Sequence, residues 1–398
     1  MCIRDSYYHW LQVWGGIMPT FSESEHGKFW NQPWTYTETD NPDSIVITAA
    51  VVDNINETNS SFRYGPTGLT LTVTYTIHKS SPAVDMSVHI HNPNSTSVDY
   101  EYWTCNTLAP GVNAKGDYGS PTMQVVAPVS TITRDNSYRW MDGVEAGTGT
   151  PRVLILNNMT KIYNWMAMGI AYGNNLNTGT QKGWWGVVNH ENDQGILRIA
   201  TSQGGTQTVT PGMKYWMWGF ESSYGTGNGN SFTTPSPLTT SNLGANDVAS
   251  PNGANRYVKG DSLAAYIELW DGVSKAFRTS RSIAAGGDLD FTDQYIPTMD
   301  LANVTNANAD GAAFVKVEPG ATDATVTADV WSTHIGQELT AKLIDLQTGE
   351  TIVKKTFVGS AYNSFRLSGL MGSGDSARLE LDDASGNVLL TADKAATS

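Results

Sequence analysis

Apolar and polar residues alternate with a period of two along most of the chain between residues 45 and 272. In GLTLTVTYTIHK, the apolar residues at the odd positions 69–77 are interleaved mainly with threonines. In SPAVDMSVHIHNPNS, the apolar residues at the even positions 84–90 alternate with polar residues that include His89 and His91. This pattern is typical of strands that bury one face. The short link KSSP predicts that the two segments form an antiparallel hairpin, with both histidines on its solvent-facing side.

Other segments with the composition of strands are separated by turn signals such as NPN, GNN, NDQG and TPG. We expect strands at residues 45–53, 97–108, 122–127, 152–157, 165–172, 184–190, 195–200, 214–221 and 263–272. No sequence segment of ten or more residues has the periodicity of an amphipathic helix. The sequence therefore predicts an all-β chain.

The character of the sequence changes near residue 300. Twelve of the 13 tryptophans precede that point, and Trp331 follows it. The remaining residues form short apolar-polar runs with tight turns at QTGE and ASGN, which is typical of a small immunoglobulin-like β-sandwich. We expect a domain boundary within residues 296–311. This predicts a larger β domain over residues 7–300 and an accessory sandwich over residues 301–398.

Composition narrows the range of partners. The formal net charge is −14, and no cluster of Lys and Arg is present to bind phosphates, so we expect no nucleic-acid partner. No apolar run reaches the roughly 18 residues that a membrane-spanning helix needs, so we expect no membrane span. Only two cysteines are present, Cys2 and Cys105, which is too few for a disulfide framework or a thiolate metal site. We expect a monomer without a metal or another cofactor.

The first six residues, MCIRDS, resemble a translated sequencing adapter of the kind found in metagenome assemblies. The chain enters strand-like aromatic sequence abruptly at Tyr7. We therefore expect residues 1–6 to be an assembly artefact and the true N-terminus to be missing. A signal peptide could have been lost with it. Because the Asn/Thr/Gly-rich composition is typical of exported bacterial β-proteins, we expect an extracellular or periplasmic protein.

Several familiar catalytic motifs are absent from the sequence, namely Gly-x-Ser-x-Gly, His-Glu-x-x-His and the phosphate-binding Gly-x-x-x-x-Gly-Lys. The segment NHENDQG at 189–195 places Asn189, Glu191 and Asp193 at alternate positions, as a calcium loop would. Its glycine falls one position late, and no closing glutamate follows at the required distance. We interpret this segment as a hairpin turn.

The segment VWGGIMPTFSESEHGKFWNQPW mixes indoles with ionisable side chains. Glu25, His26 and Lys28 lie within a few residues of Trp30 and Trp34. Aromatic faces stack on the C–H faces of sugar rings, while amide, guanidinium and carboxylate groups bind sugar hydroxyls. This composition favours a glycan site, although tryptophans that fill the space between two sheets would give the same pattern.

Five segments resemble galactose-mutarotase-like domains in their order and rough spacing, namely EHGKFWNQPW, NPNSTSVDYEYWTCNTLAPG, GWWGVVNHENDQGILRIAT, TPGMKYWMWG and AAYIELWDGVSKAF. The segment YIPTMDLANVTNANADGAAF resembles the one that follows them in one family of these domains. They are most similar to an uncharacterised family of these domains with a Pro-Gly-x-Lys-x-x-x-Trp-Gly signature. The resemblance covers about residues 7–315. It implies a β-supersandwich fold that is truncated at its N-terminus, with a His-Gly loop over a sugar site.

The resemblance also implies catalytic roles. Mutarotases use a glutamate as general base and histidines as general acids, and the segment YIELWDG maps the glutamate onto Glu268. The second mutarotase histidine is absent, because Trp103 and Asn106 occupy the matching stretch YEYWTCN. This departure disfavours simple aldose epimerisation. It leaves His26, and after it His190, as the candidate acid.

We therefore predict catalysis by Glu268 and His26, with ten further residues that bind substrate. These are Glu25, Lys28, Trp30, Trp103, Asn106, Arg139, Trp140, His190, Lys214 and Trp216. A carboxylate and an imidazole could support hydrolysis, β-elimination or epimerisation of a polysaccharide or oligosaccharide. The alternatives are a non-catalytic glycan-binding module of a secreted or surface protein, and a purely structural domain.

Overall fold

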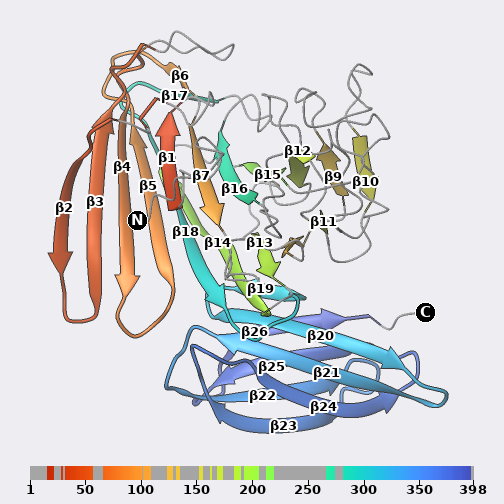
Figure 1. Ribbon diagram of the computed structural model, residues 1–398. Coiled ribbons are helices and arrows are strands. Elements are labelled where there is room, and N and C mark those ends of the chain that lie inside the picture. The colour runs from red at the N-terminus through yellow and green to blue at the C-terminus, as the bar shows by residue number, and fades with distance from the viewer. Residues whose placement is uncertain are drawn as a thin grey trace, which may run out of the picture.

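The computed structural model of the chain describes residues 16–21, 28–29, 32–56, 66–100, 102–108, 123–128, 131–134, 152–155, 162–163, 168–173, 183–189, 192–205, 212–218, 266–273 and 281–395. Throughout these ranges the regular structure consists of β-strands (Figure 1). The predicted all-β class is thereby confirmed. None of the described residues belongs to a helix that is long and apolar enough to cross a membrane.

The larger of two extended sheets has nine strands. In pairing order they are β11 (Ile162–Tyr163), β8 (Met123–Val126), β13 (Trp184–Asn189), β14 (Gln194–Gly205), β18 (Asp288–Thr298), β5 (Val84–His91), β4 (Thr70–His78), β3 (Ser44–Val52) and β2 (Thr35–Asp40). Two predicted hairpins lie within it. Strands β4 and β5 pair antiparallel across KSSP, and β13 pairs with β14 across the NHENDQG turn.

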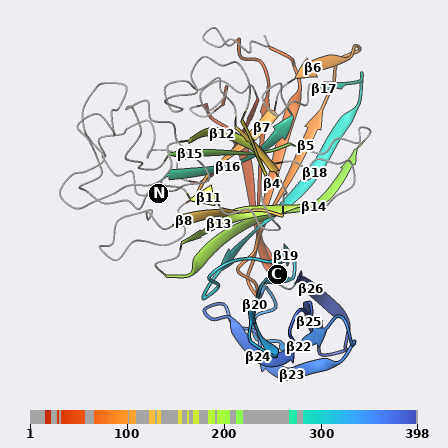
Figure 2. The ribbon, with the colours of Figure 1, turned by 90° about the vertical axis from the view of Figure 1, so that its right-hand side faces the viewer.

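The second extended sheet has seven strands. In pairing order they are β1 (Gly16–Phe21), β7 (Tyr102–Leu108), β16 (Tyr266–Val273), β15 (Gly212–Trp218), β12 (Met168–Gly173), β9 (Thr131–Arg134) and β10 (Arg152–Ile155). A short two-stranded sheet joins β17 (Arg281–Ile283) to β6 (Val98–Tyr100). Figure 2 shows the two extended sheets from the side.

The two extended sheets pack face to face over an aromatic and aliphatic core. Tyr102 on β7 meets Phe291 on β18 edge-on, with 5.7 Å between ring centroids. Phe21 on β1 contacts Tyr102 at 6.3 Å. All three rings are buried, as are Leu71 on β4 and Val88 on β5, which lie on the inner face of the nine-stranded sheet. This packing identifies which face of each strand looks into the sandwich.

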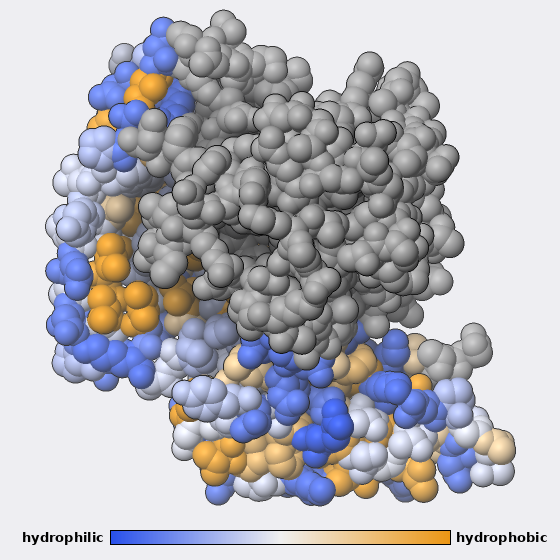
Figure 3. All heavy atoms as spheres, viewed as in Figure 1, coloured by the Kyte–Doolittle hydropathy of each residue, from blue (hydrophilic) through white to orange (hydrophobic). Residues whose placement is uncertain are grey.

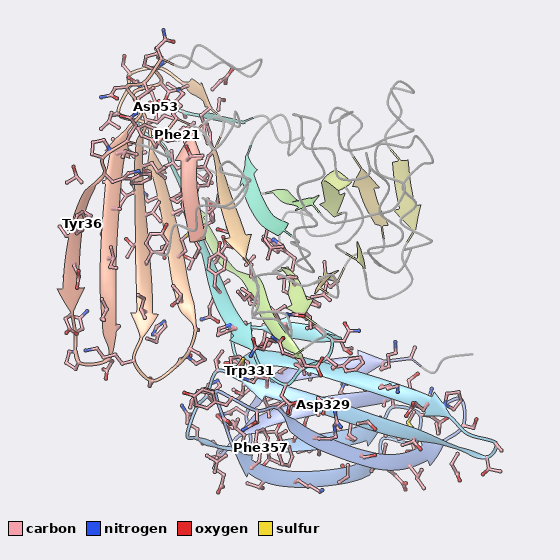
Figure 4. The ribbon with its side chains drawn as sticks, viewed as in Figure 1. Phe21, Tyr36, Asp53, Asp329, Trp331 and Phe357 are labelled. Atoms are coloured by element: carbon pink, nitrogen blue, oxygen red, sulfur yellow. The ribbon has the colours of Figure 1, made fainter. Side chains whose placement is uncertain are left out.

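Toward β2 the nine-stranded sheet presents apolar side chains at the surface. Tyr36 is 69% exposed and Ile77 is 39% exposed. Figure 3 shows apolar residues gathered on this side of the molecule, and Figure 4 shows Tyr36 at its margin.

The C-terminal residues form two four-stranded sheets. One contains, in pairing order, β19 (Asn306–Asn308), β20 (Gly311–Pro319), β21 (Asp323–Ser332) and β24 (Phe365–Gly372); the other contains β23 (Thr351–Val358), β22 (Glu338–Asp345), β25 (Ala377–Asp383) and β26 (Val388–Lys394). They enclose one core, in which Val326, Leu343 and Leu379 are fully buried. A β-sandwich is therefore present, while its immunoglobulin-like assignment and its boundary at residue 301 stay predictions.

Candidate functional site

The register of three neighbouring strands determines which residues of the seven-stranded sheet share a face. Tyr102, Thr104 and Asn106 on β7 and Leu269 on β16 are fully buried against the nine-stranded sheet. Because successive residues of a strand point to opposite faces, the alternating positions between them lie on the opposite face. We call this opposite face the Glu268 face, and it comprises positions 103, 105, 107, 214, 216, 268 and 270.

Four of the residues predicted for the sugar site occupy this face. Glu268 pairs with Trp216 on one side and with Thr107 on the other. Lys214 pairs with Trp270, and Trp103 pairs with Gly272. The four come from segments that are far apart in the sequence, and the sheet places them on three adjacent strands. Their roles in catalysis or binding stay predictions.

Trp270 was missed as a candidate, although the sequence contained a usable signal. In YIELWDG it follows Glu268 by two residues, and residues two apart in a strand share a face. The same rule separates Trp103 from Asn106, because positions three apart lie on opposite faces. Odd-even alternation along each strand therefore places position 270 on the Glu268 face and Asn106 on the opposite face.

Six predicted site residues lie outside the described residues. They are Glu25, His26, Trp30, Arg139, Trp140 and His190. The meeting of His26 with Glu268 therefore stays a prediction.

Lys28 does not have the position expected of a substrate ligand. Its ammonium group bonds both carboxylate oxygens of Asp53, at 2.9 and 3.0 Å. Both side chains are 1% exposed, and the Thr67 hydroxyl donates a further bond to Asp53 at 2.6 Å. A substrate would have to displace this buried pair to reach Lys28. In this position Lys28 anchors the segment around residue 28 to the end of β3, and its role in substrate binding stays a prediction.

Asn106 is likewise a structural residue in this fold. It is fully buried on the inner face of β7, and its Nδ2 donates to the Tyr295 hydroxyl at 2.6 Å. Tyr295 belongs to β18 of the opposing sheet, so this bond ties the two sheets together. The Asn106 side chain therefore points away from the Glu268 face, and its role in substrate binding stays a prediction.

A buried charged cluster, which the sequence did not predict, lies next to the Asn106–Tyr295 hydrogen bond. Arg198 is fully buried and forms an ion pair with Asp293. Its guanidinium carbon lies over two aromatic rings, 5.1 Å from the ring centroid of Trp185 and 5.3 Å from that of Tyr295. Burial raises the pKa of the Tyr75 hydroxyl, and the positive charge of Arg198 lowers it by a smaller amount. In the sequence, Arg198 stands between apolar neighbours at 197 and 199, so its position within a strand was visible but its partner was not.

A hollow of about 230 Å³ lies between β1, β3, β4 and the segment around residue 32. Trp34 and Tyr75 contribute to its wall, together with Ile17 and Val73. Among the described residues that line it, none is predicted for catalysis or substrate binding. It opens on the inner side of the sandwich, so it is distinct from the Glu268 face.

No protein-family model matches the chain, and a search of curated proteins found no match.

Several solved structures match part of the chain at low sequence identity. A TPR-domain containing protein from Parabacteroides distasonis has a TM-score of 0.43 and 15% identity; the match covers 72% of this chain and 38% of that one. A galactose mutarotase-like protein from Lactobacillus casei has a TM-score of 0.39 and 12% identity; the match covers 69% of this chain and 76% of that one. A galactose mutarotase related enzyme from Lactobacillus acidophilus has a TM-score of 0.40 and 7% identity; the match covers 71% of this chain and 76% of that one.

At these identities and TM-scores, the matches carry no argument about this chain, and its function has to be inferred from its own residues.

Proposed function

We propose that this chain is a carbohydrate-active protein that processes a polysaccharide or oligosaccharide on the Glu268 face by acid/base chemistry. The supporting observation is that positions 103, 214, 216 and 268 come together on three adjacent strands. Indoles offer stacking surfaces for sugar rings, and an adjacent carboxylate and ammonium can bind hydroxyl groups. This combination of residue types suits a glycan better than a nucleotide or a lipid.

Glu268 would exchange the proton. A glutamate of ordinary pKa, about 4.3, is ionised at neutral pH and can accept a proton, whereas an imidazole of pKa about 6.5 can donate one with modest tuning. His26 is the imidazole that we assign to the donor role. The pair could then move a proton at the anomeric oxygen, cleave a glycosidic bond or abstract the proton for a β-elimination.

The test is a panel of neutral and uronate-containing polysaccharides incubated with the full chain. New reducing ends indicate cleavage, and added ultraviolet absorbance from unsaturated uronates identifies elimination. Exchange of anomers without new ends, followed by NMR, identifies epimerisation. We expect Glu268→Gln to lose at least about 100-fold of the rate while it still binds the glycan.

The control is Glu338→Gln, because Glu338 is exposed on β22 of the C-terminal sandwich. An unchanged rate in Glu268→Gln would mean that Glu268 is not the catalytic base and that the reaction does not take place on this face. Saturable binding without any product, unaffected by the substitution, would instead favour a non-catalytic glycan-binding module.

A further inference from the structure

Three tryptophan positions form a diagonal across the Glu268 face. Trp103 on β7 pairs with Gly272 of β16, and Trp270 lies two residues before Gly272 on β16. Glu268 lies two residues before Trp270, and it pairs with Trp216 on the next strand, β15. Neighbouring strands are about 4.8 Å apart, and alternate residues of one strand are about 6.7 Å apart, so the diagonal is about 16 Å long. A line of this length exceeds a single sugar ring.

The residues next to this diagonal in the sheet include two glycines and two charged residues. The row that contains Trp103 continues with Gly272 and then Gly212, neither of which has a side chain. Position 214 is the cross-strand partner of position 270, and position 268 is that of position 216, so a charged residue pairs with each of these two tryptophans in the register.

We infer that the Glu268 face holds an extended glycan chain that runs over positions 216, 270 and 103. This inference rests on the proposed function and adds the class of substrate to it. The reacting sugar lies at the Trp216 end, next to Glu268, and the chain runs toward Trp103. The protein therefore selects oligosaccharides over free monosaccharides, and Trp103 is a specificity-determining residue that acts at a distance from the reacting bond.

The experiment measures affinity by titration calorimetry for ladders of one to six sugar units. Suitable probes are cello-, laminari-, manno- and xylo-oligosaccharides and oligogalacturonides. We expect the affinity to rise with each added unit and then to level off once the diagonal is filled. Trp103→Ala should lose about tenfold of the affinity for the longer members, and the monosaccharide should bind as before.

Two control variants keep the outcome interpretable. Trp103→Phe retains a stacking ring and should retain most of the chain-length effect. Tyr36→Ala removes an exposed aromatic ring from the other sheet and should change nothing. The melting temperature of each variant shows whether the fold is retained; if Trp103→Ala fails to fold, the Trp103→Phe and parent ladders carry the test.

Affinity that is independent of chain length, or an equal loss for all lengths in Trp103→Ala, would overturn the inference and leave the proposed function standing. Binding to no glycan in any ladder, together with no product from the polysaccharide panel, would overturn the proposed function itself.

Discussion

Two oppositely charged pairs lie in the interior of the larger β-sandwich, Lys28 with Asp53 and Arg198 with Asp293. A buried ion pair contributes little compared with apolar residues of the same shape, but removal of one partner leaves an uncompensated charge in the interior. In each pair the two residues are distant in the sequence, so each pair also fixes one segment against another. At the scale of the residue, these charges hold the fold in register.

For Lys28 this role can be separated from substrate binding. We predict that Lys28→Met lowers the free energy of unfolding by about 3–5 kcal/mol, because Asp53 loses its cation. Lys316→Met is the matched control, since Lys316 pairs with Glu318 at 2.5 Å and both side chains are 55% exposed. An exposed pair of that kind contributes less than about 1 kcal/mol.

Urea denaturation at neutral pH measures both variants. If Lys28→Met is as stable as the parent and loses glycan affinity instead, then Lys28 binds substrate as the sequence first indicated.

At the scale of the element, the histidines of β5 show how cross-strand neighbours modify a solvent-facing surface. His89 and His91 are 45% and 37% exposed, as their alternation predicted. Each lies directly opposite an aspartate of β18, and the bonds to Asp290 and Asp288 are both 2.6 Å long. Alternation along β5 predicts that both histidines face solvent, whereas the pairing of β5 with β18 determines which aspartate each histidine bonds.

Gly186 tests the close packing of the β13–β14 hairpin. A Cβ at this position would lie 2.3 Å from the Ile196 carbonyl oxygen and 2.9 Å from Leu197 Cα. Because backbone atoms cannot move aside as a flexible side chain can, Gly186→Ala should force β13 and β14 apart. We predict a loss of about 1–3 kcal/mol in the free energy of unfolding, although alanine is ordinarily more favourable than glycine within a strand.

Chemical denaturation together with hydrogen exchange of the β14 amides measures this effect. Unchanged stability and unchanged protection of β14 would show that the hairpin has room which its geometry does not suggest.

At the scale of the whole molecule, the C-terminal sandwich shares a core with the nine-stranded sheet. Trp331 of β21 is 1% exposed and belongs to one apolar cluster with Trp184, Leu197 and Ile296 of that sheet. The Trp184 Nε1 donates to Asn306 Oδ1 of β19 at 3.1 Å. Figure 4 shows Trp331 at this junction. A shared core of this kind couples the unfolding of the two parts.

We predict a single calorimetric transition for the parent chain, because separation of the two parts would expose this cluster to water. Trp331→Ala should lower the free energy of unfolding by about 3–5 kcal/mol and split the transition in two. Tyr362→Ala is the control, since Tyr362 is 77% exposed in the same sandwich and its loss should leave the transition intact. Two transitions in the parent would mean that the sandwich unfolds independently.

Local periodicity was enough to predict most strands of the larger β-sandwich. Strand β3 begins and ends within one residue of the predicted 45–53, and the hairpins at KSSP and NHENDQG formed as expected. Strand β18 was missed, although it lies between β14 and β5 in the nine-stranded sheet. Its buried face includes Asp293, a charged residue where the pattern requires an apolar one.

The sequence by itself determined the all-β class, the turns and the positions that share a face within each strand, because these depend on residues only a few places apart. The tertiary structure decided which strands are neighbours, and that decision brought positions 103, 216 and 268 together on one face. It also gave Lys28 and Arg198 their buried partners, and it turned Asn106 inward. Such contacts arise from pairing between segments far apart in the chain, and no pattern within a single strand specifies that pairing.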